Sequence, residues 1–274
     1  MTDGTLPDLP PARPGTTLWP PMPTEELPTA EPPSLSIFLP MFNEEENIRP
    51  AVATAQETCD LMVSTGQIRS YELIVVDDAS TDGTGKIADE LVAADPRIRV
   101  VHHPVNRKLG GAMKSGFAAA TGDLILYSDA DLPFDMSELI KAVRVQRLYE
   151  ADIVSVYRHD RTTEGLLRAV YTHAYNGLLW LLFGLRIRDV NFSFKLCRKA
   201  IFDHITLESE GSFIDAELLI RAERLGYRIM QFGTDYYPRV RGTSTLASPG
   251  VILTIVSEMR HLRRGLKSIE PVAR

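Results

Sequence analysis

The stretch Asp123-Leu-Ile-Leu-Tyr-Ser-Asp129-Ala-Asp131 combines an apolar strand pattern with two closely spaced carboxylates. Its apolar residues predict a buried strand over 123–127, and the aspartates follow where this strand ends. Residues two apart in an extended chain point to one side, so Asp129 and Asp131 can converge on one cation. Hard divalent ions take oxygen ligands, and magnesium shares them with substrate phosphates. A turn with two solvated aspartates is the alternative.

Three further apolar runs precede this strand, at 35–39, 72–76 and 98–102, and each is followed by a segment with helical character. Strand and helix therefore alternate four times, which implies an α/β fold with a mostly parallel, Rossmann-like sheet flanked by helices. Ligands bind at the carboxyl ends of the strands in such sheets. These ends carry Asn43-Glu44, Asp77-Asp78 and Asp129-Ala-Asp131. Asn43, followed by glutamates, also predicts a helix start.

The second half of the chain has a less regular pattern, which includes amphipathic helices. We expect a strand at 152–157, an apolar helix at 166–185, an extended stretch at 189–195, a helix at 213–225, a strand at 227–233, a basic loop at 238–245 and a last amphipathic helix at 251–267.

Prolines are concentrated at the start of the chain. Ten of the 18 prolines among the 274 residues fall in the first 33, and five acids against one base give that segment −4 of the total charge of −6. Proline lacks an amide donor and clashes with a helical turn, which excludes a helix or a central strand there. The composition predicts a disordered tail over 1–33 that has no secretory signal pattern, or else a polyproline segment that docks on a partner.

Bulk composition excludes several classes of protein. A hydrophobic fraction of 44% supports one large domain with a sizeable core. A pI near 5.6, without a basic patch interleaved with aromatics, argues against nucleic-acid binding. No apolar run is long enough for a membrane-spanning helix. Cys59 and Cys197 lie far apart in the sequence, which suggests reduced thiols in a cytosolic setting.

Several motifs in order resemble known enzymes. Four of them look like the nucleotide-sugar half of family 2 glycosyltransferases, which have the GT-A fold: Leu39-Pro-Met-Phe-Asn-Glu44, Val75-Val-Asp-Asp-Ala-Ser-Thr-Asp-Gly-Thr84, Asn106-Arg-Lys-Leu-Gly-Gly111 and Asp129-Ala-Asp-Leu132. Three later segments are similar to the polyprenyl-phosphate sugar transferases, typified by dolichol-phosphate mannose synthase: Asp189-Val-Asn-Phe-Ser-Phe-Lys195, Phe213-Ile-Asp-Ala-Glu217 and Pro238-Arg-Val-Arg-Gly-Thr-Ser244. We therefore expect a GT-A glycosyltransferase domain over 34–245.

The resemblance implies a nucleoside-diphosphate sugar as donor, either a UDP- or a GDP-sugar. Asp129 and Asp131 would hold Mg²⁺ or Mn²⁺ against the diphosphate. Mannose synthases often have a glutamine as a third metal ligand where this chain has Pro133, which offers no side-chain ligand. The remaining donor-side residues that the resemblance implies are Pro40, Phe42 and Glu44 around the nucleoside, Asp78 at the base, Lys108 in the basic loop, and Arg239, Arg241 and Ser244 in a loop that closes over the diphosphate.

The apolar helix expected at 166–185 is implied to bind the acceptor, a polyprenyl phosphate. Arg168, Thr172 and Asn176 share one helical face, and the resemblance assigns the first two to the acceptor phosphate, with Arg158 near the same group. The helix either packs in the core or lies in a membrane interface. Flanking basic residues favour an anionic lipid surface. Because the family places interfacial helices here, at about 160–186, we expect a peripheral protein at the cytoplasmic face of the membrane.

The amphipathic basic helix in 246–274 has two open interpretations. Its apolar stripe could bind the membrane surface, or it could form a dimer contact and make the protein a homo-oligomer.

An acceptor phosphate is already an anion, so it attacks the sugar carbon directly and inverts the anomeric centre. Transfer to a hydroxyl needs a carboxylate base, which Asp215 or Glu217 could supply. With a phosphate acceptor, these carboxylates would instead position Lys195 or the loop arginines, and Lys195 could equally be a buried ion-pair partner. The catalytic roles are thus placed on Asp131, Arg168, Asp215, Glu217 and Arg239.

Two other activities are alternatives to transfer to a lipid phosphate. The main alternative is a soluble family 2 glycosyltransferase with a small phosphorylated or hydroxyl acceptor. The second alternative is a nucleotidyltransferase, which would carry a glycine-rich loop with a lysine after its first strand. This chain has Met41-Phe-Asn-Glu44 in that place, which argues against this activity.

Overall fold

The computed structural model describes residues 31–159, 166–236 and 249–270, and it leaves the side chains of 166–173 and 249–253 undescribed. Most of the predicted tail over 1–33 and the basic loop expected at 238–245 lie outside the described residues.

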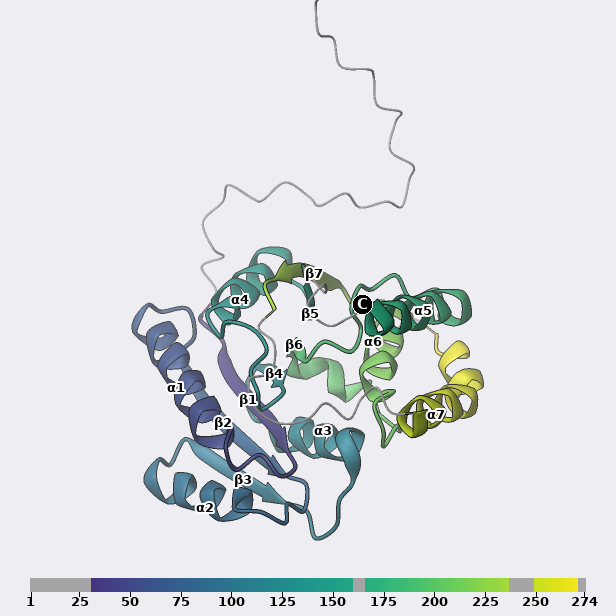
Figure 1. Cartoon of the computed structure of the whole chain (residues 1–274). Helices are drawn as coiled ribbons and strands as arrows, with labels where there is room; N and C mark the ends of the chain where they lie inside the picture. Colours follow the sequence, from purple (N-terminus) through teal and green to yellow (C-terminus); the bar gives the residue numbers. More distant parts are fainter. Residues whose placement is uncertain (1–30, 160–165, 237–248, 271–274) are drawn as a thin grey trace, which may run out of the picture.

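In the described part of the chain, seven strands form one sheet in the order β3-β2-β1-β4-β6-β5-β7 (Figure 1). Neighbouring strands are parallel except at β6, which runs antiparallel to both β4 and β5. The predicted α/β fold with a mostly parallel sheet is therefore confirmed. The strands are β1 (Ser34–Met41), β2 (Ser70–Asp77), β3 (Ile98–His102), β4 (Leu124–Ser128), β5 (Ile153–Arg158), β6 (Phe194–Arg198) and β7 (Ile229–Thr234).

Helices cover both faces of the sheet, with α1, α2 and α4 on one face and α3, α5, α6 and α7 on the other (Figure 1). The central strands are consequently apolar on both sides: Ile37 and Leu39 face one core cluster, and Phe38 between them faces the other. The helices are α1 (Ile48–Ser64), α2 (Thr84–Ala94), α3 (Lys108–Ala119), α4 (Glu138–Tyr149), α5 (Leu166–Phe183), α6 (Ile214–Arg224) and α7 (Pro249–Lys267), with a 3-10 helix at Lys199–Asp203.

Several elements differ from the sequence expectations, among them α4, a helix that the sequence pattern did not predict. The stretch expected as extended at 189–195 begins as a turn, in which the N–H of Phe192 donates to the Asp189 carbonyl at 2.9 Å. Only its last two residues belong to β6, a strand of five residues inserted antiparallel between β4 and β5. The first helix begins at Ile48 with Asn47 as its N-cap residue, so the prediction that Asn43 starts this helix is wrong. Asn43 has a left-handed backbone (φ 57°) instead, and its side chain accepts hydrogen bonds from Thr81.

The last helix packs into the protein through its apolar stripe. Ile255, Met259, Leu262 and Leu266 are all buried in the core cluster shared with α6. This burial contradicts both interpretations of the stripe, as a membrane-bound face and as a dimer contact. The side chains that remain exposed on α7 include Arg260, Arg263 and Arg264.

Both cysteines are buried free thiols, as expected for a reduced protein. Burial raises the pKa of each thiol to about 12. Among the described helices, none combines the length and apolar character that crossing a bilayer requires.

Candidate active site

The carboxyl edge of the parallel strands gathers the polar segments singled out from the sequence. Strand β1 lies between β2 and β4, with Met41 paired to Asp77 and Phe38 paired to Tyr127. The strands β1, β2 and β4 therefore end side by side, and the segments that follow them begin at the same edge. Among the residues that the structure describes, the positive-φ non-glycine residues in the loops of this edge are Asn43, Ala79, Lys108, Leu132 and Asp189. Such backbone strain concentrates at functional sites.

The predicted metal ligands follow β4 directly. The strand ends at Ser128, and Asp129 and Asp131 lie in a turn in which the N–H of Leu132 donates to the Asp129 carbonyl at 3.3 Å. The carboxylates are therefore brought together by a turn and not by strand alternation. Burial, and next the charge of Asp131, raise the pKa of Asp129 to about 6. The Tyr127 hydroxyl donates to Oδ1 of Asp129 at 3.1 Å.

This donor set fits a divalent cation that shares its coordination with substrate phosphates. Two carboxylates whose charges disfavour each other are stabilised by a cation between them, and magnesium commonly binds through one or two carboxylates plus phosphate oxygens. Among the described residues, no cluster of three or more acidic, histidine or cysteine side chains adds a further protein ligand.

Lys195 and Asp215 form a buried ion pair close to this turn. Nζ of Lys195 lies 2.6 Å from Asp215 and donates to the carbonyl of Phe192 at 2.7 Å. Burial raises the pKa of Asp215, while the ammonium of Lys195 opposes that shift. Of the roles left open for Lys195, the structure thus shows the buried ion-pair partner.

Glu217 supports the loop that precedes α6. Its carboxylate, which is completely buried, accepts hydrogen bonds from the backbone N–H groups of Glu208 (2.9 Å) and Ser209 (2.8 Å) and from Nε of Arg221 (2.7 Å). Glu258 of α7 accepts the N–H of Gly211 at 2.8 Å in the same loop. The hydrogen bonds of Glu217 are those of a structural carboxylate.

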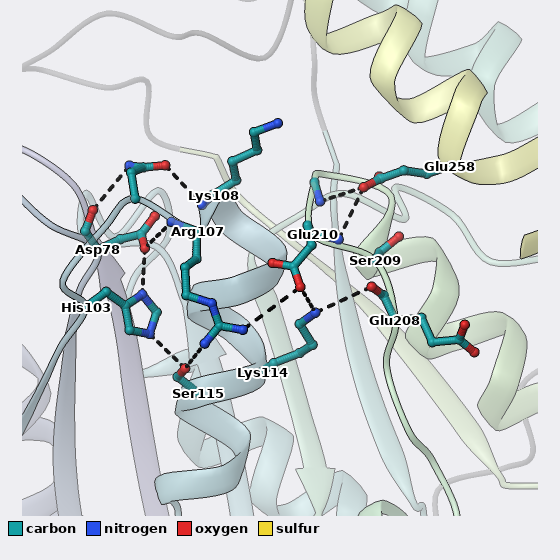
Figure 2. A network of polar contacts seen from close by, with 12 residues as sticks. Asp78, His103, Arg107, Lys108, Lys114, Ser115, Glu208, Ser209, Glu210 and Glu258 are labelled. Atoms are coloured by element: carbon teal, nitrogen blue, oxygen red, sulfur yellow. Dashed lines mark hydrogen bonds and ion pairs between the residues drawn. The ribbon is translucent and has the colours of Figure 1, made fainter. Parts of the chain in front are cut away.

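Asp78, the predicted base-binding residue, is the centre of a second buried network (Figure 2). Its Oδ1 accepts the backbone N–H of Arg107 at 2.8 Å and lies 2.6 Å from Nδ1 of His103. Asn106 donates to the Asp78 carbonyl at 3.2 Å. His103 was not among the predicted site residues, although its position directly after a strand of the sheet could have marked it.

The other donor-side residues lie at the same edge. Pro40 is a partly buried residue of β1, and Phe42 directly after the strand is 48% exposed. The carboxylate of Glu44 accepts a hydrogen bond from the Asn47 amide at 2.6 Å. Lys108 begins α3, and its exposed side chain points away from the network around Asp78 (Figure 2).

The predicted acceptor residues are only partly described. Arg168 and Thr172 lie in α5, but their side chains are outside the described part, as are Arg239, Arg241 and Ser244 entirely. The guanidinium of Arg158 makes a two-pronged contact with Asp189, with Nε at 2.7 Å and Nη2 at 2.9 Å. Its role near the acceptor phosphate stays a prediction, and in this structure its charge is matched by Asp189.

Helix α5 buries one face and exposes the other. Leu179 and Phe183 are buried in the core, whereas Trp180 and Leu181 are 54% and 72% exposed. The core interpretation therefore holds for one face of the described part of α5, and the membrane-interface interpretation of its exposed face stays a prediction.

The fold and its carboxylate-bearing edge define a glycosyltransferase with the GT-A fold. The chain belongs to glycosyl transferase family 2, whose family profile matches residues 36–206. The fold is shared with mannosyl-3-phosphoglycerate synthase from Rubrobacter xylanophilus (TM-score 0.64, 17% identity, 88% of this chain and 77% of that one). It is also shared with mannosyltransferase PcManGT from Pyrobaculum calidifontis in complex with GDP-Man and Mn²⁺ (TM-score 0.59, 16% identity, 89% and 72%).

Curated relatives have higher sequence identity. Glycosyltransferase AglD of Haloferax volcanii is 35% identical over 226 residues, which are 79% of this chain but only 36% of AglD. Dodecaprenyl-phosphate galacturonate synthase of Rhizobium johnstonii is 29% identical over 84% of this chain and 67% of its own length. Polyprenol monophosphomannose synthase of Mycolicibacterium smegmatis is 28% identical over 78% of this chain and 82% of its own length.

Proposed function

We propose that this enzyme transfers a sugar from a nucleoside-diphosphate sugar to a polyprenyl phosphate, with inversion and with the help of a divalent metal ion. The observation that carries the proposal is the pair Asp129 and Asp131 in the turn after β4, at the edge where Asp78 lies. Two relatives whose names contain a polyprenyl-phosphate product, the galacturonate and mannose synthases, support the acceptor.

The donor would lie along the carboxyl edge of β1, β2 and β4. Pro40, Phe42 and Glu44 would line the nucleoside pocket, and Asp78 would accept a hydrogen bond from the base. Lys108 would contribute a donor-side positive charge from the basic loop. The exposed ring of Phe42 offers a flat apolar surface to a base, and stacking of this kind contributes to nucleotide binding. The loop with Arg239, Arg241 and Ser244 would close over the diphosphate, because planar guanidinium groups suit phosphate oxygens.

Asp129 and Asp131 would hold Mg²⁺ or Mn²⁺. Such an ion supplies charge neutralisation for the leaving diphosphate. PcManGT, whose structure contains Mn²⁺, supports a divalent metal by its fold alone. Burial and the charge of Asp131 disfavour the ionised form of Asp129 and raise its pKa. A bound cation would favour this ionised form, so the raised pKa fits a metal ligand.

The chain's own residues are suited to an acceptor that needs no base. Asp215 is matched by Lys195, and Glu217 accepts hydrogen bonds from two backbone N–H groups and Arg221. Neither carboxylate is therefore available to remove a proton from a hydroxyl. A phosphate attacks without this step, and Arg168 and Thr172 of α5 would orient it. Alignment of the reactants would then lower much of the barrier.

The exposed side of α5 would lie on the cytoplasmic membrane surface and give access to the lipid. Trp180 and Leu181 are exposed apolar residues, and the exposed bases Arg186 and Arg188 follow the helix. Aromatic and apolar side chains beside basic residues are typical of helices that bind in the headgroup region of anionic membranes.

The test is a transfer assay with UDP- and GDP-sugars, Mg²⁺ or Mn²⁺, and a short polyprenyl phosphate, with lipid-phosphate-sugar as the product to be detected. Polyprenol and 3-phosphoglycerate serve as control acceptors. Of the three acceptors, we expect only the lipid phosphate to give product. The Asp131→Asn variant should give no product with any of them. Transfer to 3-phosphoglycerate but not to the lipid would favour the soluble alternative. Full activity of Arg168→Ala on the lipid would contradict the assigned acceptor site.

Membrane binding is tested separately by sedimentation with anionic vesicles. Trp180→Glu should reduce the bound fraction, because a charge on this face of α5 opposes insertion. Leu61→Glu is the matched control, since Leu61 is 52% exposed on α1, a helix on the opposite face of the sheet. Equal losses in the two variants would contradict binding through α5.

A further inference from the structure

The carboxylate of Asp78 is held in one orientation by buried polar contacts (Figure 2). Oδ1 lies 2.6 Å from Nδ1 of His103 and 2.8 Å from the backbone nitrogen of Arg107. The other ring nitrogen of His103 lies 2.8 Å from the hydroxyl of Ser115 on α3. The side chains of Asp78 and His103 are each 5% exposed. Because a carboxylate oxygen only accepts, Nδ1 of His103 carries the hydrogen in this contact.

These contacts leave the two oxygens of Asp78 unequal. A carboxylate oxygen has two lone pairs, and on Oδ1 both receive hydrogen bonds from the protein itself. Among the described residues, no hydrogen bond to Oδ2 is found, and Figure 2 draws this oxygen without a partner. Asp78 therefore presents a single acceptor oxygen to a ligand.

Nucleobases differ in how many donors they offer to a carboxylate. Uracil has one imide N–H, which a single oxygen satisfies. Guanine has two adjacent donors, its ring N–H and its amino group, and these suit a carboxylate with both oxygens available. Cytosine has an acceptor nitrogen at the position of the uracil imide, and a carboxylate repels it. Leaving a donor of the base unsatisfied in a buried site reduces affinity.

We propose that His103 makes Asp78 select a base with a single imide N–H, so that the donor is a uridine-type and not a guanosine-type nucleoside diphosphate. This inference rests on the proposed function, which places the base at Asp78. His103 is a positioning residue: it acts on the base through Asp78. Ser115 supports it by fixing the ring from the opposite side.

The test measures binding of free UDP, CDP and GDP to the full chain by calorimetry with Mn²⁺ present. We expect UDP to bind about tenfold or more tightly than either CDP or GDP. His103→Leu removes the contact to Oδ1 and should reduce the preference for UDP over GDP by about tenfold. His103→Asn is the matched control, because its amide nitrogen takes the place of Nδ1 and should keep the preference.

A purely structural role of His103 would weaken all three nucleotides alike and leave the ratios unchanged. An unchanged UDP-to-GDP ratio in folded His103→Leu would thus overturn the inference. Ser115→Ala, a milder change at a partly buried residue of the network, should reduce the UDP-to-GDP ratio in the same direction if His103→Leu fails to fold. GDP binding as tight as UDP in the unaltered protein would also overturn it, yet leave the proposed transferase intact. Failure to bind any of the three would contradict the proposed function itself.

Discussion

Lys195 and Asp215 form an ion pair in the interior, with 2.6 Å between Nζ and the carboxylate oxygen and with exposures of 0% and 3%. The pair connects β6 to the first turn of α6. Nζ of Lys195 also lies 5.7 Å from the centre of the Tyr127 ring, whose hydroxyl donates to Asp129. A continuous set of contacts therefore links this ion pair to the predicted metal ligand.

Breaking the pair on one side should be costly. Lys195→Met leaves Asp215 buried without its counter-charge, and we expect the free energy of unfolding to fall by about 3–5 kcal/mol. Urea denaturation measures this loss. The double variant Lys195→Met/Asp215→Leu removes both charges and should recover most of the stability. Arg49→Met, which breaks an exposed pair with Glu90, is the control and should cost about 1 kcal/mol or less. If Lys195→Met/Asp215→Leu were no more stable than Lys195→Met, the unmatched charge of Asp215 would not be the cause of the loss.

Asp129 should make the metal-free protein less stable at neutral pH than in mild acid. Its folded pKa of about 6 lies above the ordinary value of 3.8, so ionisation disfavours the folded state above pH 6. As the pH falls through 6, protonation of Asp129 removes the destabilisation that its buried charge causes. The stability regained in this way is complete near pH 4, where Asp129 of the unfolded chain also begins to protonate. Asp129→Asn should therefore stabilise the metal-free protein at pH 7.5 by about 1–2 kcal/mol.

The measurement is thermal unfolding at pH 7.5 and at pH 4, with a chelator present. The gain from Asp129→Asn should vanish at the lower pH. Mn²⁺ should raise the unfolding temperature of the unaltered protein but not that of Asp129→Asn. A gain of equal size at both pH values would mean that the charge of Asp129 is not its cause.

Glu217 should matter more for stability than for the chemical step. Glu217→Gln turns an acceptor into a donor facing the N–H groups of the loop before α6, and we expect a loss of about 1–3 kcal/mol. Transfer to a phosphate acceptor should continue at a measurable rate, in contrast to Asp131→Asn. Glu208→Gln is the control, since Glu208 contacts Arg221 from the exposed side. Complete loss of turnover in a folded Glu217→Gln protein would assign a base role to this residue.

Gly110 should not tolerate a side chain. A Cβ at this position would lie 2.4 Å from the carbonyl oxygen of Ser209 and 2.5 Å from the carbonyl carbon of Glu210, both backbone atoms. Gly110→Ala should therefore destabilise the protein by about 1–3 kcal/mol. Gly177→Ala in α5, where a Cβ meets nothing within 4 Å, should instead stabilise it by about 0.5–1 kcal/mol. Chemical denaturation of both variants tests the contrast, and equal effects would refute it.

The order of strands and helices in the first half could be predicted from the sequence because it is a local property. The apolar run before Asp129 must be buried on both faces, and a buried parallel sheet requires helices between its strands. The same reasoning located the carboxylates at strand ends, although a turn and not strand alternation brings Asp129 and Asp131 together. Strand β6 was not predicted as a strand because its five residues, which include Lys195 and Arg198, show no clear alternation of apolar and polar side chains.

The partners of the charged residues depended on contacts between segments far apart in the chain. Lys195 meets Asp215, Arg158 meets Asp189, and Glu258 of α7 meets the loop at Gly211. The apolar stripe of α7 likewise has the same sequence pattern whether it faces lipid, a second subunit or the core. In the structure it packs against α6 in the core.

The sequence by itself determined the fold class, the family and the carboxylate pair of this protein, since apolar runs and short motifs specify local structure. Only the tertiary structure decided which charges are matched and which oxygen of Asp78 is occupied. Burial makes an unmatched charge or polar group expensive, so the partner that satisfies it is set by whichever segment the fold brings within hydrogen-bond distance.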